Sequence, residues 1–194
     1  MRVKKIVILG PESTGKSYLC QQLATYFQTQ WVPEYAREFL LTNGTDYTYQ
    51  DLYSISVGQL AAENAAMEGL HFKQQSNPDL FTTPAHTIDK TFYPLLIDTD
   101  MYVMKVWSEI VFNRCDNRIL TTIAQRPYDL YLLCDTDLPW VADELREYPD
   151  LGMRQTIFQY YKDAMVNQHI PFTIIKGSYE QRFETALTAI EQLR

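Results

Sequence analysis

Residues 10–17 of the chain read GPESTGKS, which fits the phosphate-binding pattern G-x-x-x-x-G-K-[ST]. An apolar run at residues 6–9 precedes this stretch, and the residues after it place apolar side chains at helical spacing. The stretch therefore has the strand, loop and helix context in which such loops hold nucleotide phosphates. We expect the rest of the fold to be arranged around it.

Each fixed position of the loop has a physical role. Gly10 and Gly15 let the backbone turn so that N–H groups face one concavity, which the positive end of the next helix reinforces. Lys16 can reach the β and γ phosphates, and the hydroxyl of Ser17 can ligate Mg²⁺. The alternative is a glycine turn that Ser13 caps beside a solvated lysine. The predicted ATP site consists of Gly10, Glu12, Ser13, Thr14, Gly15, Lys16, Ser17 and Tyr18.

Length and composition predict one globular domain over residues 1–194. The chain is 46% hydrophobic, carries a net charge of −7 and has no long basic run, so we expect no nucleic-acid partner. Its three cysteines lack C-x-x-C spacing and are expected to be reduced. The apolar run at residues 6–9 is too short for a signal peptide, and no stretch has membrane-spanning length. These features predict a cytoplasmic protein with no membrane partner.

Strands and helices alternate along the chain, which predicts an α/β fold with a parallel sheet. The second strand, residues 29–32, stops at Pro33, so Glu34 and Arg37 follow its carboxyl end. In such sheets the ligand crevice lies outside the carboxyl ends of the strands, and both side chains are therefore candidates for binding the substrate. The alternative for Glu34 is a carboxylate that only complements a helix dipole.

A second apolar run, residues 95–97, ends at Asp98. A carboxylate at this point of a strand can hold Mg²⁺ opposite Ser17, as in a Walker B strand. Asp100 has two alternative roles: it binds hydroxyls of the substrate, or it only caps the next helix. The metal ligands predicted from sequence are thus Ser17 and Asp98.

A charged segment at residues 135–146 follows the predicted fourth strand, residues 130–133. Phosphoryl transfer needs positive charge at the transferring group and exclusion of water, which a mobile lid bearing Arg146 would supply, with Arg154 as a second candidate. The alternative is a solvated helix in which Glu144 and Glu147 neutralise Arg146.

Between these motifs the sequence predicts a long helix at residues 48–73 and a helix at 153–169. It also predicts a fifth strand at 172–175 and a last helix that Ser178 caps. Residues 74–93 contain two prolines and no usable periodicity, which leaves a functional flap or a mobile insertion as alternatives.

Four separated motifs together resemble the kinase domain of the NadR-type ribosylnicotinamide kinases: GPESTGKS, WVPEYAREF at residues 31–39, LLIDTD at 95–100 and LPWVADELR at 138–146. The resemblance implies a nucleotide-kinase-like sheet of five parallel strands, in the order 2-3-1-4-5, with flanking helices and a lid. It also implies transfer of phosphate from ATP, with Mg²⁺, to the ribose 5′-hydroxyl of nicotinamide riboside.

The resulting hypothesis assigns roles to the motif residues. Lys16 and Asp98 hold the triphosphate and its metal, Glu34 or Asp100 deprotonates the acceptor hydroxyl, and Arg146 closes over the γ phosphate. The predicted substrate-binding set is Glu34, Arg37, Asp100, Trp140, Asp143 and Arg154, with Trp140 or a tyrosine facing the cationic ring. Two other functions stay open: a nucleoside kinase with another acceptor, and a nucleotide-dependent switch with a protein or lipid partner.

Overall fold

The computed structural model describes residues 2–76 and 92–193. Within these ranges five strands form one sheet, and every neighbouring pair is parallel in the order β2-β3-β1-β4-β5. The predicted strand order is thereby confirmed. The strands are β1 (Arg2–Leu9), β2 (Trp31–Val32), β3 (Phe92–Asp98), β4 (Leu130–Cys134) and β5 (Phe172–Ile175).

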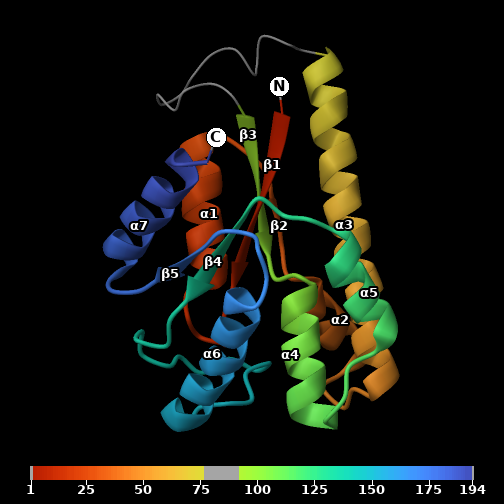
Figure 1. Ribbon diagram of the computed structural model, residues 1–194. Coiled ribbons are helices and arrows are strands. Elements are labelled where there is room, and N and C mark those ends of the chain that lie inside the picture. Colours follow the sequence, from red (N-terminus) through yellow and green to blue (C-terminus); the bar gives the residue numbers. More distant parts are fainter. Residues whose placement is uncertain (1, 77–91, 194) are drawn as a thin grey trace.

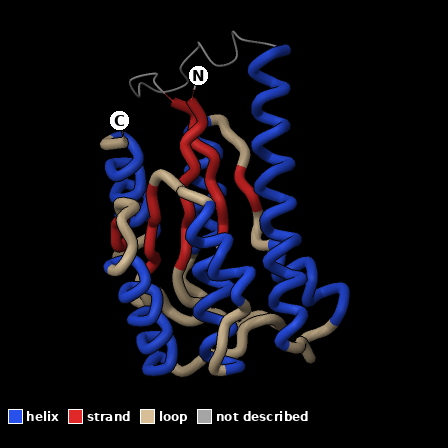
Figure 2. The backbone as a smooth tube through the Cα atoms, turned by 45° about the vertical axis from the view of Figure 1, so that its right-hand side comes forward, coloured by secondary structure: helices blue, strands red, loops and turns tan. Residues whose placement is uncertain are grey.

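Helices cover both faces of the sheet in the described part of the chain. They are α1 (Lys16–Phe27), α2 (Tyr35–Asn43), α3 (Tyr49–Ser76), α4 (Met101–Phe112), α5 (Asn117–Gln125), α6 (Leu151–Val166) and α7 (Tyr179–Glu191). Helices α1 and α7 pack side by side against one face of the sheet, and helices α2 to α6 lie against the other face (Figure 1). The same layers are visible in the rotated view of Figure 2.

Strand β1 lies at the centre of the sheet, and its side chains alternate between the two cores. Ile6 and Ile8 pack with residues of α1 and α7, whereas Val7 and Leu9 pack with residues of α3, α4 and α6. All four are fully buried, which explains why this strand reads as a continuous apolar run rather than an alternating one. The phosphate loop follows directly from this rigid strand.

Polar side chains define several helix starts. Asp150 accepts a hydrogen bond from the Met153 amide at the start of α6 (2.7 Å). Ser178 and Gln181 form the predicted capping box of α7. Helix α5 was not predicted, and among its nine residues one side chain, Ile119, is buried.

The ends of the 74–93 segment belong to regular structure, because α3 extends to Ser76 and β3 begins at Phe92. The remaining residues, 77–91, lie outside the described part, and the predicted flap or insertion falls there.

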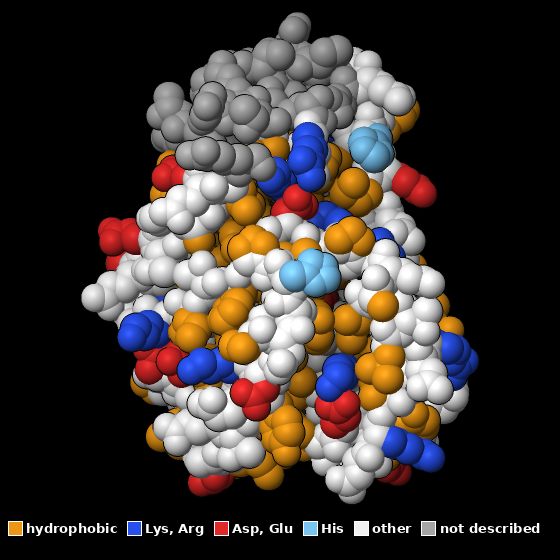
Figure 3. Space-filling view, in the orientation of Figure 1, with side chains coloured by type: hydrophobic (Ala, Val, Ile, Leu, Met, Phe, Trp, Pro, Cys, Tyr) orange, Lys and Arg blue, Asp and Glu red, His pale blue; other side chains and the backbone are white. Residues whose placement is uncertain are grey.

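Charges of both signs are mixed on the surface. On the face that Figure 3 shows, Lys and Arg side chains alternate with Asp and Glu rather than forming one large basic area. Among the described helices, none combines the length and the apolar character that crossing a bilayer requires.

One buried carboxylate interrupts the core between α3 and β4. Glu63 is fully buried and accepts a hydrogen bond from the hydroxyl of Tyr128, which lies 3.1 Å from both carboxylate oxygens. The guanidinium of Arg126 is 3.8 Å away. Burial is the largest influence on this group and raises the pKa of Glu63, although Arg126 and Tyr128 oppose the shift.

This raised pKa predicts a pH-dependent stability. The folded chain keeps its proton on Glu63 to higher pH than the unfolded chain does, so the stability contribution is full below about pH 4.3 and is lost as the pH rises. Glu63→Gln keeps an acceptor for Tyr128 and removes the titration. We expect the free energy of unfolding of the wild type, measured in urea, to fall relative to that of the variant between pH 4.5 and 7, by about 1.4 kcal/mol per unit of pKa shift. Parallel pH profiles would contradict this assignment.

Candidate functional site

The loop between β1 and α1 has a backbone that requires glycine at both fixed positions. Gly10 has a φ of +140°, and a Cβ atom there would lie 2.6 Å from the carbonyl oxygen of Cys134. Gly15 has a φ of +78° and is the residue from which α1 starts. A side chain at either position is strained, so the spacing of the two glycines follows from the backbone path.

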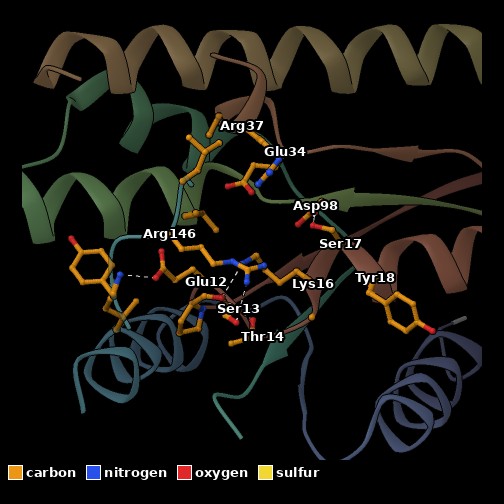
Figure 4. A pocket seen from close by; sticks show the side chains of 18 of the residues that line it. Glu12, Ser13, Thr14, Lys16, Ser17, Tyr18, Glu34, Arg37, Asp98 and Arg146 are labelled. Atoms are coloured by element: carbon orange, nitrogen blue, oxygen red, sulfur yellow. Dashed lines mark hydrogen bonds between the residues drawn. The ribbon is translucent and has the colours of Figure 1, made fainter. Parts of the chain in front are cut away.

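Hydrogen bonds within the loop hold it as a turn over the start of α1. The hydroxyl of Thr14 donates to the carbonyl of Pro11 (2.7 Å), and the Lys16 ammonium donates to the same oxygen (2.9 Å). The first N–H groups of a helix lack partners within it, and the positive end of the helix dipole adds to their attraction for anions. The loop and the start of α1 can therefore cradle phosphates. Figure 4 shows the Lys16 side chain beside Ser13 and Thr14 of this loop.

The sheet brings a carboxylate to the helix end of this loop. Asp98 is the last residue of β3 and is paired with Ile8 of β1. Its Oδ2 accepts a hydrogen bond of 2.5 Å from the hydroxyl of Ser17, as the dashed line in Figure 4 shows. The two residues predicted to share a metal are thus in contact, although 81 positions separate them in the chain.

The surroundings of Asp98 disfavour its ionised form. It is 1% exposed, and its Oδ1 has no hydrogen-bond partner. Burial is the main cause that raises the pKa of Asp98 to about 7, and the nearby carboxylate of Glu34 adds to the shift, whereas Lys16 and Ser17 oppose it. A buried carboxylate with an unused oxygen is a group that a cation or its bound water would stabilise.

These two residues fit Mg²⁺ as it is bound in nucleotide sites. No group of three or more His, Cys, Asp or Glu side chains suited to a metal occurs in the described ranges. Mg²⁺ beside phosphates needs only one or two carboxylates, because phosphate oxygens and waters complete its six positions. The hydroxyl of Ser17 and the free oxygen of Asp98 match that donor set.

Glu34 faces the cavity rather than capping its helix. It occupies the N-cap position of α2, but its side chain makes no capping hydrogen bond. The amide of Tyr35 instead donates to Gln59 Oε1 (2.9 Å), and the Gln59 amide nitrogen lies 3.5 Å from the backbone carbonyl of Asp98. Gln59 is 1% exposed, so this buried amide fixes the start of α2 against the end of β3.

The segment that follows β4, residues 135–150, forms irregular turns and lies over the phosphate loop; we call it the lid segment. The carboxylate of Glu12 accepts hydrogen bonds from the amides of Glu147 (2.9 Å) and Tyr148 (2.6 Å). The hydroxyl of Ser13 accepts one from the amide of Val141 (2.9 Å). Two side chains of the phosphate loop therefore hold the lid segment in place.

Arg146 reaches from the lid segment toward the same loop. Its Nη1 donates to the hydroxyl of Ser13 (3.3 Å) and to the carbonyl of Val141. Figure 4 shows the guanidinium between Ser13 and Lys16, on the cavity side of the lid. The alternative of a solvated helix, with Glu144 and Glu147 neutralising Arg146, is wrong, because the segment is not helical and Arg146 pairs with the loop.

Arg37 and Asp143, which we predicted to bind the substrate, bind each other. The guanidinium of Arg37 makes two hydrogen bonds to the carboxylate of Asp143 (3.0 and 3.1 Å) and so joins α2 to the lid segment. These bonds are the largest cause that lowers the pKa of Asp143. Arg37 also lines the cavity, whereas Asp143 does not.

Three other predicted substrate-binding residues are not among the residues that line the cavity. Asp100 is fully buried and accepts hydrogen bonds from the Tyr102 amide (3.0 Å) and the Tyr131 hydroxyl (3.1 Å), so it caps α4. Trp140 turns its indole nitrogen toward Glu12 (3.4 Å) and thus anchors the lid.

Arg154 is the third of these residues. It is 3% exposed in the first turn of α6, and its Nε and Nη1 have no partner. It shares a helix face with Ile157 and Tyr161, which line the cavity one and two turns further along. Arg154 lies behind the cavity wall.

The cavity has a volume of about 670 Å³, and its lining includes aromatic side chains whose place there the sequence did not reveal. Trp107 of α4, Tyr148 of the lid and Tyr161 of α6 line it. Trp107 and Tyr161 belong to apolar helix stripes that are indistinguishable from core positions in the sequence. The cavity also includes most of the predicted site: Gly10, Glu12, Ser13, Thr14, Gly15, Lys16, Ser17, Tyr18, Glu34, Arg37, Asp98 and Arg146.

Two curated proteins are similar to this chain over almost its whole length. The trifunctional NAD biosynthesis/regulator protein NadR of Salmonella typhimurium is 25% identical over 196 residues, covering 98% of this chain and 43% of that protein. NadR of Escherichia coli K12 is 24% identical with the same coverage. The chain thus spans less than half the length of these curated relatives.

Solved structures show the same fold. A crystal structure of a NadR protein in complex with NR has a TM-score of 0.72 and 19% identity, over 98% of this chain and 51% of that chain. Thymidylate kinase from Ehrlichia chaffeensis has a TM-score of 0.61 and 12% identity, over the whole of both chains. The fold is that of the P-loop nucleotide kinases.

A family model described as an AAA domain matches residues 5–182, a range that includes the phosphate loop, Glu34, Asp98 and the lid segment. Because this match extends over nearly all of the sequence, the chain belongs to the AAA_28 family of AAA domains, as a NadR-like P-loop NTPase kinase domain.

Proposed function

We propose that this chain is an ATP-dependent kinase that phosphorylates the ribose 5′-hydroxyl of nicotinamide riboside to give nicotinamide mononucleotide. One observation carries the proposal: a single cavity is lined by the phosphate loop, by Asp98 and Glu34 and by several aromatic side chains. Group transfer needs donor and acceptor to meet in one enclosed space, and a cavity of about 670 Å³ suits two small ligands that react there.

The donor half of the cavity holds the triphosphate. The loop amides and Lys16 would bind its oxygens, and Ser17 and Asp98 would hold Mg²⁺, which when bound neutralises charge on the phosphates. Arg146 then supplies positive charge at the γ phosphate from the lid side. Arg154, whose buried guanidinium has two unpaired nitrogens, is a second source of positive charge behind the wall.

The acceptor half positions the hydroxyl. Glu34 occupies the N-cap position of α2 and lines the same cavity as Asp98. A carboxylate so placed can orient a ribose hydroxyl and take its proton during transfer. Asp100 is buried and caps α4, which favours Glu34 over Asp100 as the base.

The aromatic side chains of the cavity favour an acceptor molecule that carries a cationic ring. Nicotinamide riboside carries a positive pyridinium, which Trp107, Tyr148 or Tyr161 can face, with a gain of about 0.5–2 kcal/mol. Similar NadR structures hold NR in one case, and NAD with AMP-PNP in another. A thymidylate kinase and a deoxyadenosine kinase share the fold, so another nucleoside is the second candidate acceptor.

A product assay tests this function. The protein is incubated with Mg-ATP and a panel of nucleosides that includes nicotinamide riboside, and the masses of the products are read. We expect the mononucleotide of nicotinamide as the main product and no transfer to any acceptor by Lys16→Ala. Hydrolysis of ATP without a phosphorylated nucleoside would contradict the kinase and favour a nucleotide-dependent switch.

The role of Glu34 is tested by Glu34→Gln. This change removes the base but keeps the shape, so turnover should fall by about 10²–10⁴ while the affinity for a nonhydrolysable ATP analogue stays within about twofold. Glu38→Gln is the matched control, because Glu38 is an exposed carboxylate on the same helix. Near-normal turnover of Glu34→Gln would remove Glu34 from the role of base.

A pair of tryptophan variants tests the corrected aromatic assignment. Trp107→Leu should raise the KM for nicotinamide riboside about five- to tenfold, because the ring that faces the pyridinium is lost. Trp140→Leu should leave that KM within about twofold, because Trp140 lies outside the cavity. The reverse order of effects in steady-state kinetics would restore Trp140 as the substrate contact.

A further inference from the structure

Arg182 is a buried charge that the proposed chemistry leaves unexplained. It lies in the first part of α7 and is 2% exposed. Its Nε donates to the carbonyl of Gly177 (2.9 Å), its Nη1 to the carbonyl of Thr14 (3.1 Å) and its Nη2 to the carbonyl of Asp135 (3.0 Å). One guanidinium thus joins the β5–α7 connection, the phosphate loop and the start of the lid segment.

The bond to Thr14 fixes one peptide of the phosphate loop. No cis peptide bond occurs in the described ranges, so the Thr14–Gly15 peptide is trans and its C=O and N–H point in opposite directions. Arg182 holds the C=O on the outer side of the loop. The Gly15 N–H is thereby turned to the opposite side, away from Arg182.

The same guanidinium is tied to the root of the lid segment. Its Nη2 also donates to the carboxylate of Asp137, whose other oxygen accepts a hydrogen bond from the Gly177 amide (2.5 Å). A Cβ atom at Gly15 would lie 3.1 Å from Leu138 and 3.4 Å from Tyr179, so both neighbouring segments pack closely on this peptide. Asp137 offsets the charge of Arg182, which a buried cation requires.

We propose that Arg182 is a positioning residue for triphosphate binding: it acts through the Thr14–Gly15 peptide and keeps the Gly15 N–H directed into the phosphate cradle. The proposal rests on the proposed function, because it presumes that a triphosphate binds in the loop. Arg182 itself does not line the cavity and does not touch the ligand. Its planar fork reaches three carbonyls, which the single ammonium of a lysine cannot do.

The test compares two ligands that the proposed function assigns to the donor and the acceptor parts of the cavity. Binding of inorganic tripolyphosphate with Mg²⁺, and separately of nicotinamide riboside, is measured by calorimetry for the wild type and Arg182→Lys. We expect the dissociation constant for tripolyphosphate to rise about tenfold and that for the riboside to stay within about twofold. A role in folding alone would weaken both ligands together or neither, and either result would overturn the proposal.

Gln181→Ala is the matched control for damage to α7. It removes the capping box beside Arg182 without touching Thr14, so it should lower the melting temperature and leave tripolyphosphate affinity within about twofold. If Gln181→Ala weakens tripolyphosphate as much as Arg182→Lys does, the positioning role is wrong.

If Arg182→Lys does not fold, a second variant tests the same positioning role. Asp137 has a side chain that is 38% exposed, and Asp137→Asn removes the negative charge that offsets Arg182 and leaves one oxygen acceptor for Arg182 or the Gly177 amide. We expect it to weaken tripolyphosphate about threefold, and unchanged affinity would overturn the proposal. If the wild type binds no tripolyphosphate, both the proposed function and this inference are overturned. If the wild type binds it and Arg182→Lys binds it with the same affinity, only this inference is overturned.

Discussion

The parallel pairing of β1 with β3 is the interaction on which the site depends. It sets Ile8 beside Asp98, so the strand that enters the phosphate loop and the strand that ends in the carboxylate finish at the same level. The short contact between Ser17 and Asp98 follows from this register. A shift of one residue would turn Asp98 to the other face of the sheet and separate it from the loop.

The phosphate loop has a second task, because its variable positions hold the lid. Glu12 and Ser13 point away from the turn that the glycines form, and they accept hydrogen bonds from backbone and side-chain donors between residues 140 and 148. The pairing of Arg37 with Asp143 fixes the other side of the lid to α2. The lid is thus attached to both halves of the cavity, which suits a segment that closes over donor and acceptor together.

Local patterns predicted the parts of the site that are local in the chain. The glycine spacing predicted the loop, Pro33 placed Glu34 just after the second strand, and the apolar run at residues 95–97 placed Asp98 at the end of the next strand. Trp140 was misplaced because no periodicity exists in an irregular lid, so the direction of its ring depends on the contact with Glu12. Trp107 and Gln59 were missed because their roles arise from packing between helices and strands that are distant in sequence.

The shape of the eight-residue motif is therefore set partly from outside it. Within the loop, the side chains of Thr14 and Lys16 donate hydrogen bonds to the carbonyl of Pro11. The carbonyl of Thr14, in contrast, accepts its hydrogen bond from Arg182 of α7, which is distant in the sequence. A peptide whose carbonyl lacked that partner would be free to rotate, and its N–H would lose its fixed direction. N–H groups that already point into the site bind a phosphate without a free-energy cost of reorientation. Arg182 and the phosphate loop therefore form one functional unit.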